Sequence, residues 1–346
     1  MVLHGGPDAE GVARWDFSTN ANACGPAPMA LLDVDPSCYP DPSSTALKAA
    51  LAAHHGVDPQ RIVIAASASE FIARASTAVA LRLPGAGVFA PRPGYGDYRA
   101  AAQARGLREV ALEAAQLVWQ TSPDSPLGRT VAVLPAAGAL HVVDCAYAPL
   151  RLDVPERDPF GLSLSKAGAL GHQPFDTGLR QAQSLLRANG VKANGDAWQL
   201  WSPNKALGLT GVRGAYAIAP PDDPWQASIE ALAPSWPLGA HGVAMLTAWT
   251  RPATQHWLQD SLATLTRWKA RQLELCASLG WSCEDSETPF HVARGPGLVE
   301  RLPALRRHGI KLRDTASMGL PGAVRLGVQP PAAQDALARA WMEVTR

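Results

Sequence analysis

The sequence lacks the features that mark several large classes of protein. Its 346 residues carry a formal net charge of only +1 at pH 7, so it has neither the basic excess of a nucleic-acid-binding protein nor an acidic tail. Its cysteines include no C-x-x-C pair, which argues against a disulfide scaffold or a structural zinc site and favours a reducing compartment. The five cysteines are Cys24, Cys38, Cys145, Cys276 and Cys283.

Long apolar runs and targeting signals are missing as well. No uncharged apolar run approaches the roughly 20 residues that a membrane helix needs. The N-terminus "MVLHGGPDAEG" has no basic and apolar regions of a signal peptide. Internal repeats and long low-complexity segments are also absent from the sequence. These absences predict a soluble cytoplasmic protein that binds neither nucleic acid nor membranes.

The residues that are present predict an α/β protein with two domains. Strand patterns alternate with helix patterns over residues 60–220, which indicates a mostly parallel sheet with helices on both faces. A helix is expected over residues 45–55, ended by Gly56, and the longest helical pattern covers residues 253–279. We expect an N-terminal arm over 1–35, a large domain over 36–222 and a smaller C-terminal α/β domain over 223–346. The stretch 150–195 gives no clear pattern.

One lysine, in the segment "SPNKALGLTGVRG", is the first candidate for chemistry. Lys205 follows an apolar strand pattern and is surrounded by small residues, so we place it at the edge of the sheet where α/β proteins bind ligands. A poorly solvated amine is suited to attack a carbonyl. In "VVDCAY", Asp144 ends another apolar strand, and a carboxylate buried there needs a cationic partner. Tyr147 follows three residues later.

Two further segments lie at predicted strand ends. In "AASASE", the backbone N–H groups of Ser67, Ala68 and Ser69 open a helix and could bind a phosphate. In "PRPGYGDY", Tyr95 could stack on a flat ligand. Each pattern alone has an ordinary structural interpretation, such as a loop lysine, a capping Asp or a core Tyr. Together they describe a pocket for pyridoxal 5′-phosphate (PLP).

The sequence resembles the fold-type I PLP enzymes of the class I/II aminotransferase superfamily. Within it, the resemblance is strongest to the branch of histidinol-phosphate aminotransferases and the threonine-phosphate decarboxylases of cobalamin biosynthesis. It is carried by the segments "DFSTNANACG", "YPDP", "SASEFI", "PGYGDY", "SPDSPLG", "VVDCAY", "SPNKALGLTGVRGAYAI" and "LRDTASMGLPGAVRLGV". The resemblance implies a large domain with a mostly parallel sheet covered by helices and a smaller C-terminal α/β domain.

The resemblance also assigns roles around the cofactor. Lys205 binds PLP as a Schiff base and later moves the Cα proton. Asp144 pairs with the pyridine N–H, while Tyr147 reaches the ring oxygen and Tyr95 stacks on the ring. The cofactor phosphate is assigned to Ser202, Arg213 and the backbone of residues 67–69.

Substrate contacts are implied by the same resemblance. Arg325 corresponds to the arginine that grips the substrate carboxylate, and Arg313 lies at a position that tends to serve a substrate phosphate. Asn22 and His4 lie in N-terminal segments that approach the substrate. Tyr39 corresponds to a tyrosine that reaches the PLP phosphate of the neighbouring subunit, which implies a homodimer with shared active sites.

One departure from the family leaves the reaction open. Relatives have an Asn that bonds to the PLP ring oxygen, and here that position is Ser125, whose shorter side chain loses the contact or needs a bridging water. We expect a PLP-dependent transaminase acting on a small amino acid that can bear a phosphate. The alternatives are an L-threonine-O-3-phosphate decarboxylase, favoured by "HGG" and "DFSTNAN", and a PLP-binding protein that has lost catalysis.

Overall fold

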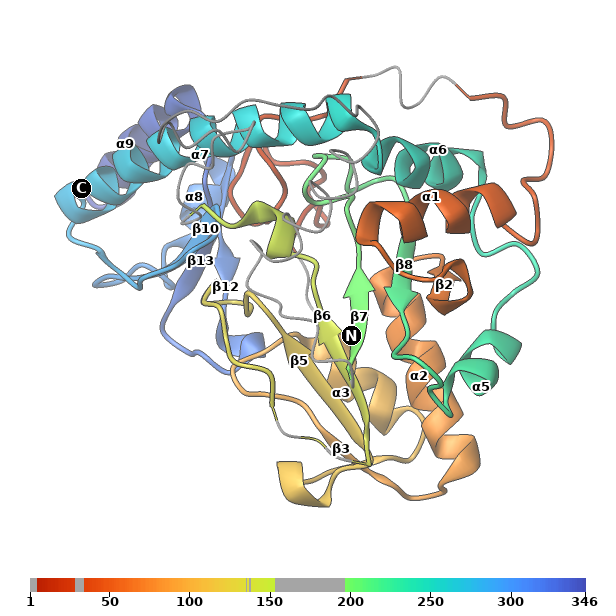
Figure 1. Ribbon diagram of the computed structural model, residues 1–346. Coiled ribbons are helices and arrows are strands. Elements are labelled where there is room, and N and C mark those ends of the chain that lie inside the picture. The colour runs from red at the N-terminus through yellow and green to blue at the C-terminus, as the bar shows by residue number, and fades with distance from the viewer. Residues whose placement is uncertain (1–4, 29–33, 135, 137, 153–196) are drawn as a thin grey trace, which may run out of the picture.

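The computed structural model describes residues 5–28, 34–134, 136, 138–152 and 197–346, and it contains two main sheets flanked by helices (Figure 1). The larger sheet has seven strands in the order β2-β8-β7-β6-β5-β3-β4. Its strands are β2 (Ile62–Ala65), β3 (Gly87–Phe89), β4 (Arg108–Glu109), β5 (Leu117–Thr121), β6 (Leu140–Asp144), β7 (Trp198–Trp201) and β8 (Ala215–Ile218). The predicted stretch 150–195 falls almost entirely outside the described residues.

The direction of the strands confirms the predicted mostly parallel sheet. Strands β7, β6, β5, β3 and β4 are parallel to one another, whereas β8 is antiparallel to both β2 and β7. The central strands are apolar because both faces are covered, and β5 and β6 are buried along their whole length. The carboxyl ends of all strands except β8 therefore lie at one edge.

Helices form a layer on each face of this sheet. Helices α1 (Thr45–His55) and α6 (Ala240–Trp249) cover one face, and α2 (Ala68–Arg82), α3 (Gly96–Gln103) and α5 (Gln226–Ala231) cover the other. Helix α1 has the predicted bounds. It ends because Gly56 adopts φ +66°, a left-handed conformation that glycine reaches without strain.

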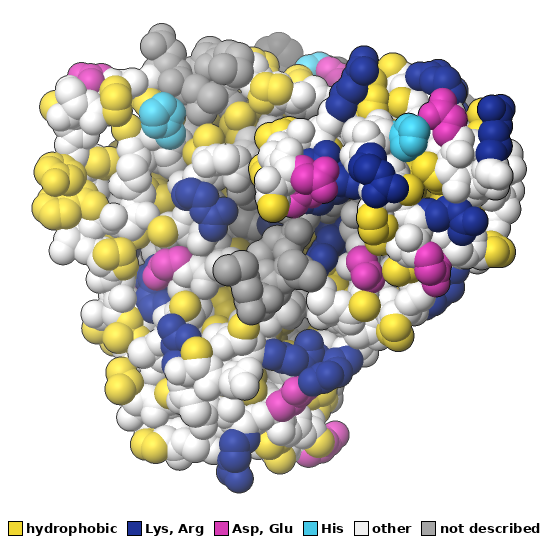
Figure 2. All heavy atoms as spheres, turned by 180° about the vertical axis from the view of Figure 1, so that it is seen from behind, with side chains coloured by type: hydrophobic (Ala, Val, Ile, Leu, Met, Phe, Trp, Pro, Cys, Tyr) yellow, Lys and Arg dark blue, Asp and Glu magenta, His cyan; other side chains and the backbone are white. Residues whose placement is uncertain are grey.

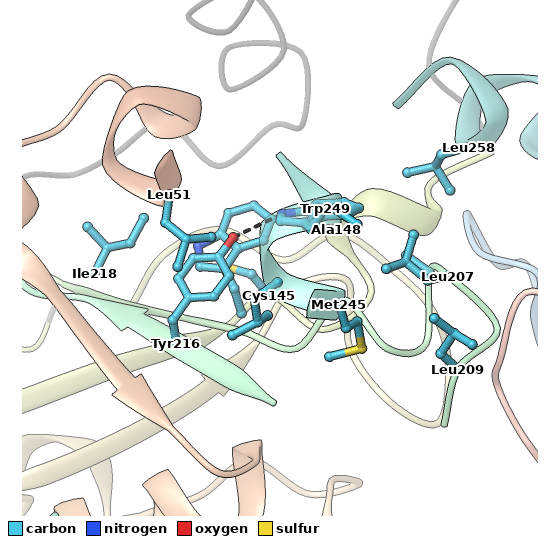
Figure 3. Packing of buried hydrophobic residues seen from close by; sticks show 14 of the residues in the cluster. Leu51, Cys145, Ala148, Leu207, Leu209, Tyr216, Ile218, Met245, Trp249 and Leu258 are labelled. Atoms are coloured by element: carbon cyan, nitrogen blue, oxygen red, sulfur yellow. Dashed lines mark hydrogen bonds between the residues drawn. The ribbon is translucent and has the colours of Figure 1, made fainter. Parts of the chain in front are cut away.

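The core beneath α1 and α6 contains a buried polar group (Figure 3). The hydroxyl of Tyr216 on β8 accepts a hydrogen bond from Trp249 Nε1 at 3.1 Å and lies 2.7 Å from His55 Nε2. All three side chains are nearly inaccessible. Burial holds the pKa of His55 well below its usual value of 6.5, so a neutral imidazole joins α1 to the sheet.

A second, antiparallel sheet forms the smaller domain, with strand order β12-β13-β10-β9. Its strands are β9 (Ser282–Cys283), β10 (Phe290–Arg294), β12 (Arg313–Asp314) and β13 (Val324–Gly327), and its helices are α7 (Pro252–Ser278), α8 (Leu302–Arg307) and α9 (Pro331–Val344). The N-terminal strand β1 (Trp15–Asp16) pairs in parallel with β11 (Ile310–Lys311). The arm therefore packs with the smaller domain, as its predicted role requires.

Two helices that follow the predicted boundary at residue 222 pack on the large sheet. The Pro/Asp segment there is only a turn into α5, whose Ile229 is buried under the large sheet. Helix α6 also packs on that sheet through Met245 and Trp249. Long helix α7 then joins both units, because Leu258 belongs to the core of the larger and Cys276 to the core of the smaller.

The molecular surface has mixed charge. On the face drawn in Figure 2, Lys and Arg side chains are scattered among acidic and uncharged ones. In the described part of the chain, no helix combines the length with the apolar content that crossing a membrane requires.

Candidate active site

A cavity of about 660 Å³ opens at the edge where the parallel strands end, a size within the roughly 300–1,000 Å³ of small-molecule sites. Such edges are where open α/β sheets bind ligands. The cavity brings together most of the residues predicted from the sequence: Ser67, Ala68, Ser69, Tyr95, Ser125, Asp144, Tyr147, Ser202, Lys205, Arg213 and Arg325.

Lys205 lies in the loop that follows β7, as predicted. Its amine donates a long hydrogen bond of 3.5 Å to Ser202 Oγ and lies 5.6 Å from the centre of the Tyr147 ring. The side chain is half-buried, and its positive charge partly offsets the rise that burial causes in the pKa of Asp144 at the end of neighbouring β6. Among the described residues, the lysine amine is thus held by a single weak hydrogen bond.

Asp144 is a fully buried carboxylate at the floor of the cavity. Its Oδ2 accepts a hydrogen bond from the Tyr98 hydroxyl at 2.8 Å and its Oδ1 accepts one from the Ala146 backbone N–H at 2.9 Å. Burial nevertheless raises the pKa of this carboxyl above its usual value, against the lowering effects of Lys205 and these hydrogen bonds. A carboxylate in this position requires a cationic partner in the cavity.

Sequence reasoning missed Tyr98 and Thr121, which orient Asp144. The Tyr98 hydroxyl lies 2.8 Å from Thr121 Oγ1, at the end of β5, and donates to Asp144. The Tyr98 ring also stacks on Trp119 with 5.0 Å between centroids. Thr121 could have been found as the polar residue that ends the strand beside Asp144, since such residues meet at one sheet edge.

The predicted role of Asn22 at the substrate is corrected by the structure. The Asn22 amide donates to the Ala206 carbonyl and to Ser261 Oγ, so it ties the N-terminal arm to the lysine loop and to α7. Asn20, two residues earlier, lines the cavity instead, and its amide donates to the Tyr147 hydroxyl at 3.1 Å. The short polar segment "STNAN" predicted that an Asn approaches the active site, but not which of its two Asn residues does so.

The glycines of the lysine loop have a defined role. At Gly208 the backbone has φ +66°, and a Cβ there would lie 2.8 Å from the Cα of Gly25. The arm and the loop approach this closely because Asn22 N–H donates to the Lys205 carbonyl. Only glycine at position 208 permits the contact.

The start of α2 supplies unpaired backbone donors to the cavity. Ser67 caps the helix by accepting a hydrogen bond from Glu70 N–H, while the first N–H groups of the helix, at Ala68 and Ser69, precede any intrahelical partner. Both residues line the cavity. With Ser202 and the Arg213 guanidinium on the same wall, this end of the cavity suits a phosphate.

Tyr95 lies beside this wall, at the first turn of α3. Its hydroxyl donates to Asp97 Oδ2 at 2.6 Å, and Ser69 Oγ donates to the same oxygen at 2.8 Å. Burial and the Asp97 charge raise the pKa of the Tyr95 hydroxyl, which therefore stays protonated. These hydrogen bonds fix the ring where the predicted stacking on a flat ligand is possible.

The opposite wall is formed by Arg325 on β13. Its guanidinium donates to the Ser18 carbonyl at 3.0 Å and to Ser125 Oγ at 3.3 Å, and it lies 5.7 Å from the Phe290 ring centre. Its buried Nε has no hydrogen-bond partner among the described residues. Burial lowers the pKa of this group to about 10, so it remains a cation at neutral pH. Ser125 therefore bonds to the arginine, a contact that the sequence did not predict.

Besides Asn22, two of the predicted residues that the structure describes, Arg313 and Tyr39, do not line the cavity. Arg313 is buried beside Arg325 in the β12–β13 pair, and its guanidinium donates to Ser317 Oγ at 2.9 Å. Tyr39 is 80% exposed and stacks on Trp236 in a separate groove. His4 lies outside the described residues.

The cavity fits PLP by its donor set. A buried acid at Asp144 suits a protonated pyridine, an available amine at Lys205 suits the aldehyde, and the α2 N-terminus with Arg213 suits the phosphate. Arg325, whose Nε has no hydrogen-bond partner among the described residues, adds a cation to the cavity wall that suits a further anion. Lys205, which supplies the amine, and Arg213, which contributes to the phosphate site, both belong to the loop between β7 and β8.

Comparisons with known proteins agree with this geometry. Residues 174–340 match the family model "Aminotransferase class I and II". A histidinol-phosphate aminotransferase of Erythrobacter litoralis is 30% identical over 240 residues, which cover 61% of this chain but only 62% of that relative.

Two solved structures share the fold over nearly the whole chain. The histidinol-phosphate aminotransferase of Sinorhizobium meliloti, in complex with pyridoxal-5'-phosphate, has a TM-score of 0.71 at 24% identity and covers 94% of this chain and 89% of its own. The L-threonine-O-3-phosphate decarboxylase of Porphyromonas gingivalis has a TM-score of 0.66 at 17% identity, with coverage of 89% and 90%. The chain is therefore similar to class I and II aminotransferases over residues 174–340 and shares the fold of these PLP-dependent enzymes.

Proposed function

We propose that the protein is a PLP-dependent aminotransferase that acts on a small amino compound able to carry a phosphate. The observation that supports this most is the arrangement of one cavity: an available amine at Lys205, a buried carboxylate at Asp144 and a desolvated cation at Arg325. PLP, which the similar structure from Sinorhizobium meliloti contains, would bind between them. Phosphate-bearing substrates are proposed from the histidinol-phosphate relatives.

Each residue has a defined part in the proposed reaction. Bound PLP supplies the electron sink for the charge that develops at the substrate Cα. Lys205 would take the proton from the substrate Cα. Asp144 would hold the protonated pyridine nitrogen, and Tyr147, which accepts a hydrogen bond from Asn20, would donate to the ring oxygen. Arg325 holds the substrate carboxylate by a planar pair of N–H groups.

A cytoplasmic homodimer is the assembly we propose. Tyr39 is exposed on the chain's own surface, away from the cavity, and its ring stacks on Trp236 at 4.6 Å between centroids. An exposed stacked pair is suited to cover a partner, and Tyr39 would then reach the phosphate site of the second subunit. The groove beside it is lined by the buried flank of α6, including Ala244 and Ala248.

Decarboxylation of threonine phosphate is the second candidate. Gly5 and Gly6 of the "HGG" segment line the cavity, which supports this candidate because it would need that segment close to the substrate. The bond that breaks is the one held perpendicular to the cofactor ring. Lys205 next to Cα–H favours transamination, whereas a carboxylate turned out of the ring plane favours loss of carbon dioxide.

A product assay separates these reactions. The protein is incubated with PLP and either histidinol phosphate plus a keto acid or L-threonine phosphate alone, and the products are identified by mass spectrometry. We expect exchange of the amino group in the first mixture and no carbon dioxide in the second. Aminopropanol phosphate from the second mixture would establish the decarboxylase instead. Absence of turnover in both mixtures would support loss of catalysis.

Replacing Arg325 by lysine should weaken the carboxylate site without removing its charge. A lysine cannot reproduce the planar pair of N–H groups, and a hydrogen bond to a charged group contributes about 1.5–3 kcal/mol. We expect kcat/KM for the amino donor to fall roughly 10- to 100-fold, mainly through KM. Arg294→Lys, on the neighbouring strand with a contact only to the Pro321 carbonyl, is the matched control. Equal effects of both variants would refute the assignment.

A further inference from the structure

Two cysteines and a histidine meet in the smaller domain, away from the cavity. The ligand-bearing atoms of Cys276, Cys283 and His291 all lie within 4.8 Å of one another. Cys276 Sγ is 3.9 Å from His291 Nε2. Cys276 is in the last turn of α7, Cys283 is on the edge strand β9, and His291 is on β10.

The sheet register explains why these side chains converge. Cys283 pairs with Ala293, so both point to the same face as His291, two residues before Ala293. Cys276 and Ala293 belong to one buried cluster, which places the end of α7 over that face. Arg325 pairs with Val292 and therefore points to the other face. The cluster and the active site lie on opposite sides of one sheet.

The polar groups of this cluster lack ordinary partners. His291 is completely buried, and among the described residues its Nδ1 has no hydrogen-bond partner while Nε2 has only sulfur nearby. Buried imidazoles are normally bonded on both nitrogens or bound to an ion. Cys276 is also fully buried, whereas Cys283 is half-buried and accessible.

We propose that Cys276, Cys283 and His291 bind a zinc ion. Thiolate and imidazole are the donors that Zn²⁺ prefers, and no harder oxygen ligand belongs to the cluster. Zinc forms bonds of about 2.3 Å to sulfur and 2.0 Å to nitrogen, so the three ligand atoms of a tetrahedral site would lie somewhat closer together than they do here. Rotation of the accessible Cys283 side chain would bring them to these shorter separations. Each thiol releases its proton to solvent on binding, and water takes the fourth position.

The proposed site would overturn an expectation from the sequence. Absence of a C-x-x-C pair argued against structural zinc, but Cys276 and Cys283 are separated by the turn at Gly280 and His291 comes from the next strand. The ion would join α7, which links both domains, to the edge of the small sheet. This inference is independent of the reaction that the active site catalyses.

Cobalt titration is the test, since Co²⁺ replaces Zn²⁺ and is coloured. Reduced, PLP-loaded protein is titrated and difference spectra are recorded. We expect one equivalent to produce thiolate-to-cobalt charge-transfer absorption and the intense visible bands of tetrahedral cobalt, both removed by Zn²⁺. Zinc should also raise Tm by several degrees and slow alkylation of Cys283. Cys283→Ser should weaken cobalt binding by at least about 100-fold. This exceeds the roughly 10- to 100-fold loss caused by mutating residues that only bond to the metal ligands.

Cys38→Ser is the matched control, because Cys38 is exposed and outside the cluster. It should leave cobalt binding unchanged. The proposal fails if wild-type protein gives no charge-transfer band in excess cobalt, if the band persists in Cys283→Ser, or if protein isolated without oxidant contains a Cys276–Cys283 disulfide in place of metal. Should Cys283→Ser not fold, alkylation of wild-type protein decides: an unchanged rate with zinc refutes the site.

Discussion

Lys205→Ala is expected to lose at least about 10³-fold in kcat while remaining folded. A single positioned proton-transfer group contributes roughly 10²–10⁴-fold, and here the same amine also anchors the cofactor. Its 3.5 Å hydrogen bond to Ser202 is long and contributes little to the stability of the fold. Single-turnover kinetics with the amino donor measure the loss, and circular dichroism reports folding.

The spectrum of the same variant distinguishes two causes. Wild-type protein should be yellow, with a visible band that borohydride bleaches because PLP is joined to the lysine. Lys205→Ala should lose this band and release its PLP on dialysis. Lys48→Ala, which removes a partly exposed lysine paired with Glu230 on the surface, should keep the band and the activity. A Lys205→Ala protein with wild-type turnover would overturn the proposed function.

Asp144→Asn should separate activity from stability. Loss of the charge that holds the pyridine proton is expected to lower kcat by roughly 10²–10³-fold, the size of a lost electrostatic partner in a buried site. The fold should tolerate the change, because an amide can still accept from Ala146 N–H and donate to Tyr98, whose hydroxyl is also beside Thr121. Activity is measured with saturating PLP.

The raised pKa of Asp144 sets the sign of its effect on the cofactor-free protein. Burial raises the folded-state pKa above the ordinary 3.8, so the folded protein holds this proton more tightly than the unfolded chain does. Stability therefore decreases as pH rises from about 3.8 to the raised value, and then stays level. Asp144→Asn removes this decrease. Urea unfolding of both PLP-free proteins at neutral pH should show the variant to be at least as stable.

Asp335→Asn is the control for that experiment, because Asp335 is an exposed residue paired with Arg271 far from the cavity. It should change neither kcat nor the pH dependence of unfolding. A clear loss of stability in Asp144→Asn would mean that the carboxylate is a structural hydrogen-bond acceptor first, and would weaken its assignment to the cofactor.

The sequence predicts the parts of the site that local chain geometry determines. Lys205 and Asp144 each follow an apolar strand, and parallel strands end at one edge, so their meeting follows from pattern alone. Helix α1 was also predictable to the residue, because Gly56 stops it.

Contacts that depend on tertiary packing were not predictable in this way. The choice between Asn20 and Asn22 depends on how the arm crosses the lysine loop, where Gly25 and Gly208 meet. Tyr98 lies on α3, which β4 and β5 separate in sequence from β6, yet the Tyr98 hydroxyl donates to Asp144 at the end of β6. Ser125 of the larger domain likewise accepts a hydrogen bond from Arg325 of the smaller one. The Pro and Asp residues near position 222 likewise indicate a turn, but they do not indicate which sheet the next helix covers.

The antiparallel strand β8 has a consequence for how the protein assembles. Because β8 returns directly beside β7, the amine at 205 and the guanidinium at 213 are joined by one short connection. Their contacts are local in the chain, whereas Asp144 must arrive from a separate strand after a long intervening segment. Local contacts form at low entropic cost. We therefore expect Lys205 and Arg213 to come together early in folding, before Asp144 joins them. Binding of the coenzyme would then mark a late step of folding.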